Sequence, residues 1–336
     1  MLLREKAYGA AYLSAKEYQE EQTRLAGNRT GFGLSVTVKD ADLLVMTVDE
    51  GSPAALAGIV KGDRITAVDG EAVTGTAHTE VEQKIATLEK LILTVVHDGA
   101  PTAVELTANT YTYISVSGRL LDGNVGYIRI REFNNVTPLQ FKNVYNDLTQ
   151  QCATYFMFDV RNNAGGQSAA VQEILDYLLP RGPYANCKKK GETIALTATD
   201  TYEMTAPTVT LVNANTVGEA ELFAAVLQDM SKTRLIGTTT EGKAVMQEYA
   251  TIQSDKGAVR LTVGTLYRIH GDTTWADSGL IPNQLVDLSF DKLTYFELLT
   301  DEEDDQLQAG LEVFKNGAFL SAVTEPTTTT TTTVAP

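Results

Sequence analysis

The chain has 336 residues, of which 43% are hydrophobic and 21% are charged, as is usual for a globular protein. This length leaves room for two domains with a sizeable core. With 27 basic and 43 acidic residues the net charge is −16, which argues against nucleic acid or an anionic membrane surface as a partner. No run approaches the roughly 18 apolar residues of a membrane-spanning helix, so we predict no membrane span.

The first residues and the cysteines indicate where the protein resides and whether it contains disulfides. Charged residues follow Met1 almost at once and no signal peptide is recognised, so we expect either a cytoplasmic protein or a chain that begins inside a longer one. Cys152 and Cys187 are too few for a disulfide framework, and a bridge between them is the less expected arrangement. Metal-binding motifs are absent from the sequence. We therefore predict no metal and no other cofactor.

The chain begins with two segments that differ in their residue patterns. Residues 1–29 combine helical spacing around Ala11 and Tyr12 with a charged run, which predicts an N-terminal helical segment. From Gly31 onward short strands follow one another, interrupted by the glycine-punctuated stretch GSPAALAGIVKGDRITAVDG at residues 51–70. We expect residues 30–108 to form one compact domain of mixed strands and helices.

Residues 31–106 of this second segment resemble a PDZ domain. The resemblance implies that Gly31, Phe32, Gly33 and Leu34 form its carboxylate-binding loop, with Phe32 and Leu34 also packed in the core. Backbone N–H groups of a glycine-containing turn can hold a terminal carboxylate, while an exposed strand edge beside a helix accepts the peptide as an extra strand. The expected partners are peptide or protein C-termini and unfolded or extended polypeptide.

Residues 109–322 alternate strands with helices. The run at 155–160 predicts a buried strand, and helices are expected over residues 137–151 and 169–179. The first of these helices should turn one apolar face inward, formed by Leu139, Phe141, Val144 and Leu148. This alternation predicts an α/β fold class with α+β character, in which helices pack on a parallel or mixed sheet.

Two adjacent glycines, Gly165 and Gly166, come just after the strand at 155–160. Open sheets of this kind place their sites at the carboxyl ends of the strands. A plain strand-to-helix turn needs only one glycine, so the pair indicates close approach of another backbone or of a ligand.

The segment 208–247 organises the rest of the chain. It is expected to form a strand, a tight turn, a helix with Leu222 and Phe223 on its apolar face, a second strand and a loop that carries the isolated Lys243. Hydrolases often place a nucleophile where a strand feeds a helix through a sharp turn, because the turn exposes one side chain beside free helix N–H groups. The residue at the head of this helix is Gly218, which has no side chain.

The order of motifs now resembles a known family. After the PDZ-like segment come YIRIREF, DVRNNAGG, VNANTVGEAELFAAVLQD, GTTTEGKAVMQ and the late Gly279-Leu280-Ile281-Pro282. This order is similar to that of the carboxyl-terminal processing peptidases, which are PDZ-containing serine endopeptidases with a Ser/Lys dyad (tail-specific protease-like). The similarity runs from about residue 11 to residue 317.

The resemblance implies a site in which one component is missing. The general base of the family falls on Lys243, the glutamine that orients it on Gln247, and the oxyanion region on Gly165 and Gly166. The nucleophile of the family is the middle serine of a Ser-Ala-Ser-Ala-Ser-Glu motif at the helix head, and its position here is Gly218. Further departures from the pattern are Ala164 for a proline, Glu241 for an aromatic residue and Ala244 for a glycine.

A glycine at this position removes the atom that the dyad needs. Acyl transfer requires a hydroxyl within hydrogen-bond reach of an amine held neutral by burial, and loss of such a nucleophile costs about 10⁶ in rate. Glu219 is expected to compete for the oxyanion donors and to form an ion pair with Lys243. A hydroxyl elsewhere could stand in for the nucleophile, but Thr216 is displaced along the turn and Ser168 is more readily explained as a helix N-cap.

Three functions follow from these residues. The leading one is an inactive pseudo-peptidase that still binds peptides through its PDZ domain. The second is an active serine-type endopeptidase, with a displaced nucleophile or with Gly218 as an engineered replacement of serine. The third is a cell-surface scaffold. The Thr/Pro-rich end of the chain, residues 323–336, is expected to be disordered and resembles the stalks of secreted or surface proteins, which favours an extracytoplasmic location. A homo-oligomer is compatible with all three.

Overall fold

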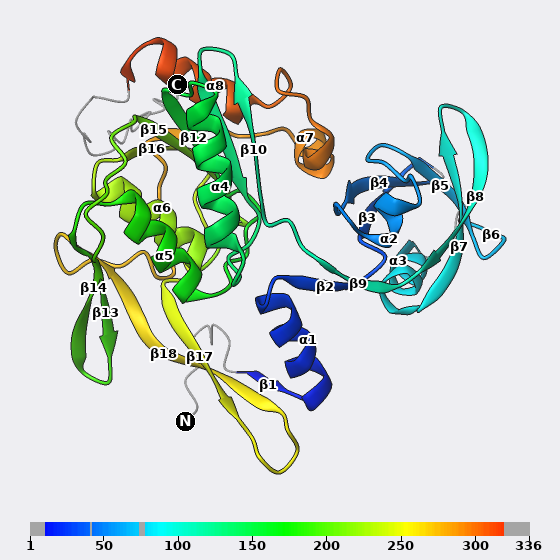
Figure 1. Ribbon diagram of the computed structural model, residues 1–336, viewed down its shortest axis with the longest axis horizontal. Coiled ribbons are helices and arrows are strands. Elements are labelled where there is room, and N and C mark those ends of the chain that lie inside the picture. Colours follow the sequence, from blue (N-terminus) through cyan, green and yellow to red (C-terminus); the bar gives the residue numbers. More distant parts are fainter. Residues whose placement is uncertain (1–10, 41, 74–77, 319–336) are drawn as a thin grey trace, which may run out of the picture.

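The structure is a computed structural model that describes residues 11–40, 42–73 and 78–318. The predicted Thr/Pro-rich tail, residues 323–336, lies outside these ranges. The chain forms a PDZ-like unit and a larger core, with an N-terminal helix between them (Figure 1). The predicted mixed α/β class is confirmed. In the part of the chain that is described, no helix is both long and apolar enough to cross a membrane.

The core is built on a six-stranded sheet in which the central strands are parallel. Its order is β10-β11-β12-β15-β16-β19, and only β10 runs antiparallel to its neighbour. The strands span Val116–Leu121 (β10), Val125–Ile130 (β11), Tyr155–Asp159 (β12), Thr208–Val212 (β15), Thr233–Gly237 (β16) and Gln284–Leu285 (β19). All five residues of β15 are buried, as its β-branched, apolar sequence predicts for a central strand.

Helices cover both faces of this sheet. On one face lie α4 (Thr137–Gln150), α5 (Ser168–Leu178) and α6 (Glu219–Asp229), where Ile128 and Phe158 of the strands join the main apolar cluster. The other face packs Met157 and Val209 against α8 (Asp305–Lys315). The short α7 (Phe290–Thr294) and the 3-10 helix η1 (Phe296–Leu298) precede α8. The side chains at the strand ends are therefore held by packing from two sides.

One predicted core residue is wrong. Leu139 was expected on the inner face of its helix, but its side chain is 65% exposed. The buried residues of α4 are Thr137, Pro138, Phe141, Tyr145 and Leu148. Leu139 follows Thr137 by two positions, and residues two apart on a helix point in different directions. The apolar pattern predicted the helix correctly but not the edge of its buried face.

A second, five-stranded sheet lies beside the helical layer. Its strands are β1 (Ala11–Leu13), β13 (Gly182–Lys189), β14 (Glu192–Ala198), β17 (Val245–Thr251) and β18 (Ala258–Arg268), and all of its pairs are antiparallel. The N-terminal segment therefore contributes a strand as well as the expected helix α1 (Ala15–Leu25), which begins at a capping box between Ser14 and Glu17. Both cysteines are free, Cys187 buried in β13 and Cys152 exposed.

The PDZ-like unit is a strongly bent sheet with two helices. Its strands pair in the order β3-β4-β5-β7-β8, with β6 beside β5, so that β3 is an edge strand. These elements span Leu34–Lys39 (β3), Asp42–Val48 (β4), Arg64–Val68 (β5), Glu71–Ala72 (β6), Lys90–His97 (β7), Ala100–Thr107 (β8), Pro53–Leu56 (α2) and His78–Thr87 (α3). Leu43, Ile65 and Leu93 are completely buried in its own apolar core.

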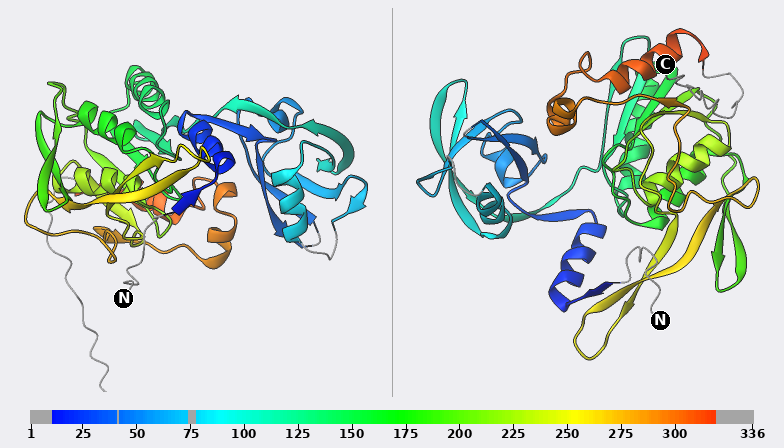
Figure 2. Two further views of the ribbon diagram at one scale, coloured as in Figure 1. Left: turned by 90° about the horizontal axis from the view of Figure 1, so that it is seen from below. Right: turned by 180° about the vertical axis from the view of Figure 1, so that it is seen from behind.

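A two-stranded ribbon joins this unit to the core. It pairs β2 (Asn28–Gly31) with β9 (Asn109–Thr112), so the chain enters and leaves the PDZ-like unit side by side (Figure 2). Arg29 of the ribbon contacts Glu132 of the core at 3.2 Å and Asp49 of the PDZ-like unit at 3.4 Å. Glu132 also binds Arg24 of α1 at 2.5 Å. One buried carboxylate thus connects α1 and the ribbon to the core.

Candidate active site

The head of α6 is a sharp turn with an unusual backbone conformation. Gly218 precedes the helix with φ 61° and ψ −114°, a region that residues with a Cβ rarely adopt. Its N–H donates to Glu221 Oε2 at 3.0 Å. The strand-to-helix turn predicted from the sequence is present, with Gly218 itself buried at the N-terminus of α6.

Lys243 faces this turn from the loop before β17. A Cβ added to Gly218 would meet only Lys243, at 3.7 Å from Cδ and 4.0 Å from Nζ. A hydroxyl carried on that carbon could come within hydrogen-bond distance of the amine. The structure therefore brings together the two positions at which the dyad was expected, and one of them is an empty glycine.

The surroundings of Lys243 favour its neutral amine. Burial lowers the pKa of Lys243 below its usual 10.5, and the nearby charge of Arg260 acts in the same direction. The carboxylates of Glu219 and Glu221 oppose this shift. The predicted ion pair with Glu219 is not formed, since no contact within 4.0 Å joins these two described side chains.

Glu219 instead lies against Gly165 and Gly166, the glycines expected to form the oxyanion region. Its Oε2 accepts a hydrogen bond from the N–H of Gly166 at 3.1 Å, and its Oε1 accepts one from the Ser168 hydroxyl at 2.9 Å. The same Oε2 lies 2.6 Å from the place where a Cβ of Gly165 would stand. This agrees with the expected competition for the oxyanion donors. It also explains the missing ion pair, because the carboxylate is turned toward α5 rather than toward Lys243.

Another backbone approaches the two adjacent glycines, Gly165 and Gly166, too closely for a side chain. A Cβ on Gly166 would lie 1.9 Å from the carbonyl oxygen of Phe133. Phe133 donates its N–H to the Gly165 carbonyl at 3.0 Å, and its own carbonyl accepts the N–H of Gln167 at 2.7 Å. The close approach predicted from the adjacent glycines is present, and the partner is a backbone of the same chain.

Neither alternative hydroxyl is placed to act as a nucleophile. Thr216 is completely buried, where its hydroxyl donates to the Val160 carbonyl at 2.9 Å and accepts the N–H of Asn213 at 3.0 Å. The prediction that Ser168 caps α5 is wrong, because Gln167 is the N-cap and Ser168 is the first helical residue. Its hydroxyl is engaged with Glu219.

Glu221 has a role that the sequence analysis missed. Oε1 accepts from the Thr240 hydroxyl at 2.5 Å and the Gly242 N–H at 2.8 Å, while Oε2 accepts from the N–H groups of Lys243 at 2.8 Å and Gly218 at 3.0 Å. Burial raises the pKa of Glu221, and these hydrogen bonds act against the rise. Its position three residues after the helix cap, typical of a capping box, was the available signal.

Gln247 lies in β17, half-buried and opposite Thr262 of β18. Its predicted role of orienting Lys243 stays a prediction. A β-bulge between Met246 and Gln247 shifts the register of β17 just after the Lys243 loop.

Among the described residues, no group of three or more His, Cys, Asp or Glu side chains is arranged to hold a metal ion.

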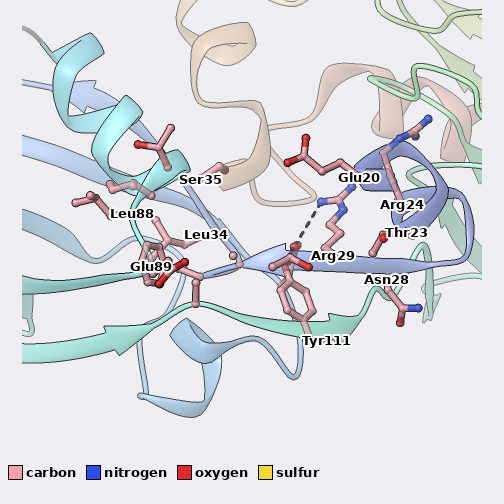
Figure 3. Close-up of a pocket in the computed structure, with 18 of the residues that line it drawn as sticks. Glu20, Thr23, Arg24, Asn28, Arg29, Leu34, Ser35, Leu88, Glu89 and Tyr111 are labelled. Atoms are coloured by element: carbon pink, nitrogen blue, oxygen red, sulfur yellow. Dashed lines mark hydrogen bonds and ion pairs between the residues drawn. The ribbon is translucent and has the colours of Figure 1, made fainter. Parts of the chain in front are cut away.

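The second candidate site is a cleft of about 1130 Å³ beside the PDZ-like sheet (Figure 3). All four residues of the predicted carboxylate loop line it: Gly31, Phe32, Gly33 and Leu34. Phe32 is also buried in the core of the unit, with only 2% of its surface exposed. The cleft runs along the edge strand β3, which has a free side for an added peptide strand.

Helix α1 forms an unexpected wall of this cleft. Lys16, Gln19 and Glu20 line it together with Ile85 and Leu88 from the α3 side. In Figure 3 the labelled Glu20 and Arg24 of α1 stand across from Leu34 and Leu88. No residue pattern predicts this wall, because it depends on how α1 is placed relative to the PDZ-like unit.

Comparisons with known proteins match both the core and the PDZ-like unit. Residues 124–286 match the description "Peptidase family S41", and residues 44–96 match "PDZ domain". The chain is 28% identical to the carboxy-terminal processing protease CtpA of Bacillus subtilis, over 86% of this chain and 63% of that protein. It is 27% identical to the carboxyl-terminal-processing protease of Synechocystis, over 92% of this chain and 74% of the relative. The chain thus spans somewhat less than two thirds of the Bacillus protein.

Solved structures give the same fold. The photosystem II D1 C-terminal processing protease superposes with a TM-score of 0.53 at 25% identity, covering 88% of this chain and 82% of that one. A putative S41 protease from Bacteroides fragilis reaches a TM-score of 0.69 at 20% identity, covering 85% and 83%. From its PDZ domain, its peptidase core and the order of its motifs, this chain belongs to the carboxyl-terminal processing peptidase family.

Proposed function

We propose that this family member binds peptide or protein C-termini through its PDZ domain but does not cleave them. The observation that carries the proposal is the head of α6, where Gly218 offers no atom to Lys243. A Ser/Lys dyad without its oxygen cannot form an acyl-enzyme. The expected loss is about 10⁶ in rate.

The position of Glu219 adds a second obstacle to catalysis. An oxyanion needs donors that are free when negative charge develops on the substrate. The N–H of Gly166 already donates to the Glu219 carboxylate, and the N–H of Gly165 donates to Asn163 at 2.8 Å. The Glu219 carboxylate resembles the carboxylate of a cleaved peptide product. It accepts a hydrogen bond where catalysis would need a free donor.

The PDZ cleft supports the binding half of the proposal. The N–H groups of a glycine loop and the free edge of β3 are the elements with which such grooves hold a terminal carboxylate and an extended chain. We also propose an extracytoplasmic location, supported by the Thr/Pro-rich sequence at residues 323–336. A homo-oligomer stays a prediction.

Peptide binding can be measured by fluorescence anisotropy with matched peptides that end in a free carboxylate or an amide. We expect tighter binding of the free carboxylate and its loss in Gly33→Ala, because a Cβ there would lie 2.1 Å from the Cβ of Ser52. Gly51→Ala is the matched control: both glycines have positive φ, 77° and 73°, but nothing stands within 4 Å of a Cβ on Gly51. Equal binding of both peptides would contradict the proposal.

Cleavage is tested separately on an unfolded protein substrate. The natural sequence should leave the substrate intact, and Lys243→Ala should behave identically. Cleavage that disappears in Lys243→Ala would show an active dyad with a displaced nucleophile and would overturn the pseudo-peptidase proposal.

A further inference from the structure

Lys243 is a half-buried amine without an ionic partner. Within the described parts of the chain, no carboxylate lies within 4.0 Å of its Nζ. Other partly exposed lysines are paired, as Lys189 is with Glu248 at 2.7 Å and Lys142 with Glu173 at 2.9 Å. The backbone N–H of Lys243 is fixed by Glu221 at 2.8 Å. The loop therefore holds this amine in place without neutralising it by a counter-ion.

The space in front of the amine is open on the side of Gly218. A Cβ at that position would find no atom closer than 3.7 Å, and the atoms within 4.0 Å belong to Lys243 itself. In a serine enzyme this space belongs to the nucleophile. Here it can receive a small substituent of a molecule that reacts with the amine.

We propose that Lys243 is a carbonyl-reactive amine that captures small aldehydes as imines, with the aldehyde substituent placed beside Gly218. The lone pair of Nζ forms a bond to the carbonyl carbon, and the carbonyl oxygen takes up the proton that the nitrogen releases. The resulting carbinolamine then loses water, which forms the C=N bond. Amine and aldehyde are converted into imine and one water, with no oxidant or reductant involved.

The charged groups around Lys243 are consistent with this chemistry. Only a neutral amine attacks a carbonyl, and burial lowers the pKa of Lys243 while Arg260 of β18 acts in the same direction. Glu219 and Glu221 of α6 favour the protonated form but are engaged with Gly166 and with the Lys243 loop. The inference goes beyond the proposed function and shares with it the positions of Gly218 and Lys243.

The test is reductive trapping of the native protein with propionaldehyde and sodium cyanoborohydride at neutral pH, followed by peptide mass spectrometry. We expect Lys243 to be alkylated about tenfold faster than Lys189, because the Lys243 amine is half-buried without an ionic partner whereas that of Lys189 is paired with Glu248. In concentrated urea the difference should disappear, because both lysines are then solvated. Equal rates in the native protein would overturn the proposal.

Lys61 provides a control for the role of the space beside Gly218. Desolvation also lowers the pKa of Lys61, which lies in the PDZ domain just before β5 and does not line the turn at Gly218. Gly218→Ala should slow alkylation of Lys243 and leave Lys61 unchanged. An equal effect on both lysines, or none on Lys243, would contradict the assignment. Because the readout is a covalent mass on one lysine, it is independent of whether the protein cleaves peptides.

Discussion

Glu221 is the side chain that holds the two candidate catalytic positions together. Its carboxylate accepts four hydrogen bonds, from the backbone of Gly218, Gly242 and Lys243 and from the Thr240 hydroxyl, and it is completely buried. Each donor left without a partner in the interior costs about 1–3 kcal/mol. The geometry that points Gly218 at Lys243 therefore depends on one acid that takes no part in the dyad chemistry.

Replacing this acid should be strongly destabilising. We expect Glu221→Ala to lower the free energy of unfolding by about 3 kcal/mol or more, because several buried N–H groups lose their acceptor. Urea denaturation followed by circular dichroism measures it. Glu173→Ala is the matched control: Glu173 is 57% exposed and paired with Lys142, so the cost should stay below about 1 kcal/mol. Similar costs for both would contradict the role of Glu221.

The burial of Lys243 has a signature in the pH dependence of stability. Its pKa is lowered below 10.5 in the folded protein, so between the lowered value and 10.5 the unfolded chain binds more protons. The free energy of unfolding then rises with pH across this window, whereas below the window the full cost of burying the charge is present.

Lys243→Met removes this titration. The difference in free energy of unfolding, natural sequence minus Lys243→Met, should be flat at low pH and should rise toward pH 10.5 by about 1.4 kcal/mol for each pKa unit of lowering. Chemical denaturation over a pH series measures the difference. A difference that falls with rising pH would mean that folding raises the pKa of Lys243, as the rejected ion pair with Glu219 requires.

At the scale of helices and strands, the sequence predicted the type of each element better than which side of it is buried. The turn before α6 and the glycine loop before α5 lie where the residue patterns placed them, because glycine spacing and apolar periodicity are local properties. Leu139 and the ion pair of Glu219 were wrong. Both depend on which neighbouring helix a side chain meets, and that is decided by tertiary packing.

Helix α4 allows the predicted and the observed buried faces to be compared directly. Phe141 is fully buried and stacks on Tyr145 with ring centroids 6.2 Å apart, while Leu139 is 65% exposed. Phe141→Ala should cost about 3–5 kcal/mol by cavity formation, and Leu139→Ala less than about 0.5 kcal/mol. Urea denaturation of the two variants measures both. A large cost at Leu139 would restore the face expected from the sequence.

At the scale of the whole molecule, a group of described side chains links α1, the ribbon and the PDZ domain to the core. Glu132 binds Arg24 of α1 and Arg29 of the ribbon, and Arg29 also stacks on Tyr113, with its guanidinium carbon 3.3 Å from the ring centroid. A second contact places Lys39 of the PDZ domain 5.3 Å from the ring centroid of Tyr295. Because α1 is one wall of the peptide cleft, the same contacts set the width of that cleft.

Glu132→Ala should loosen this arrangement. Arg24 keeps Glu21 and Arg29 keeps Asp49, but their common link to the core is lost. We expect an increased maximum dimension in small-angle X-ray scattering and weaker peptide binding. Glu20→Ala, which breaks an exposed pair with Lys16 and leaves the contacts of Glu132 in place, should change the scattering little. An unchanged maximum dimension in Glu132→Ala would show that the other contacts suffice.

We attribute the proposed inactivity of the molecule to Gly218 and Glu219, and replacing both residues is the decisive measurement. Cleavage of an unfolded substrate should be absent in the natural sequence, weak in Gly218→Ser, and about 10²–10³ faster in Gly218→Ser combined with Glu219→Ala, which frees the oxyanion donor. A further Lys243→Ala change should abolish it. Lys243-dependent cleavage by the natural sequence, or a folded double variant that stays inactive, would contradict the assignment of Gly218 and Glu219.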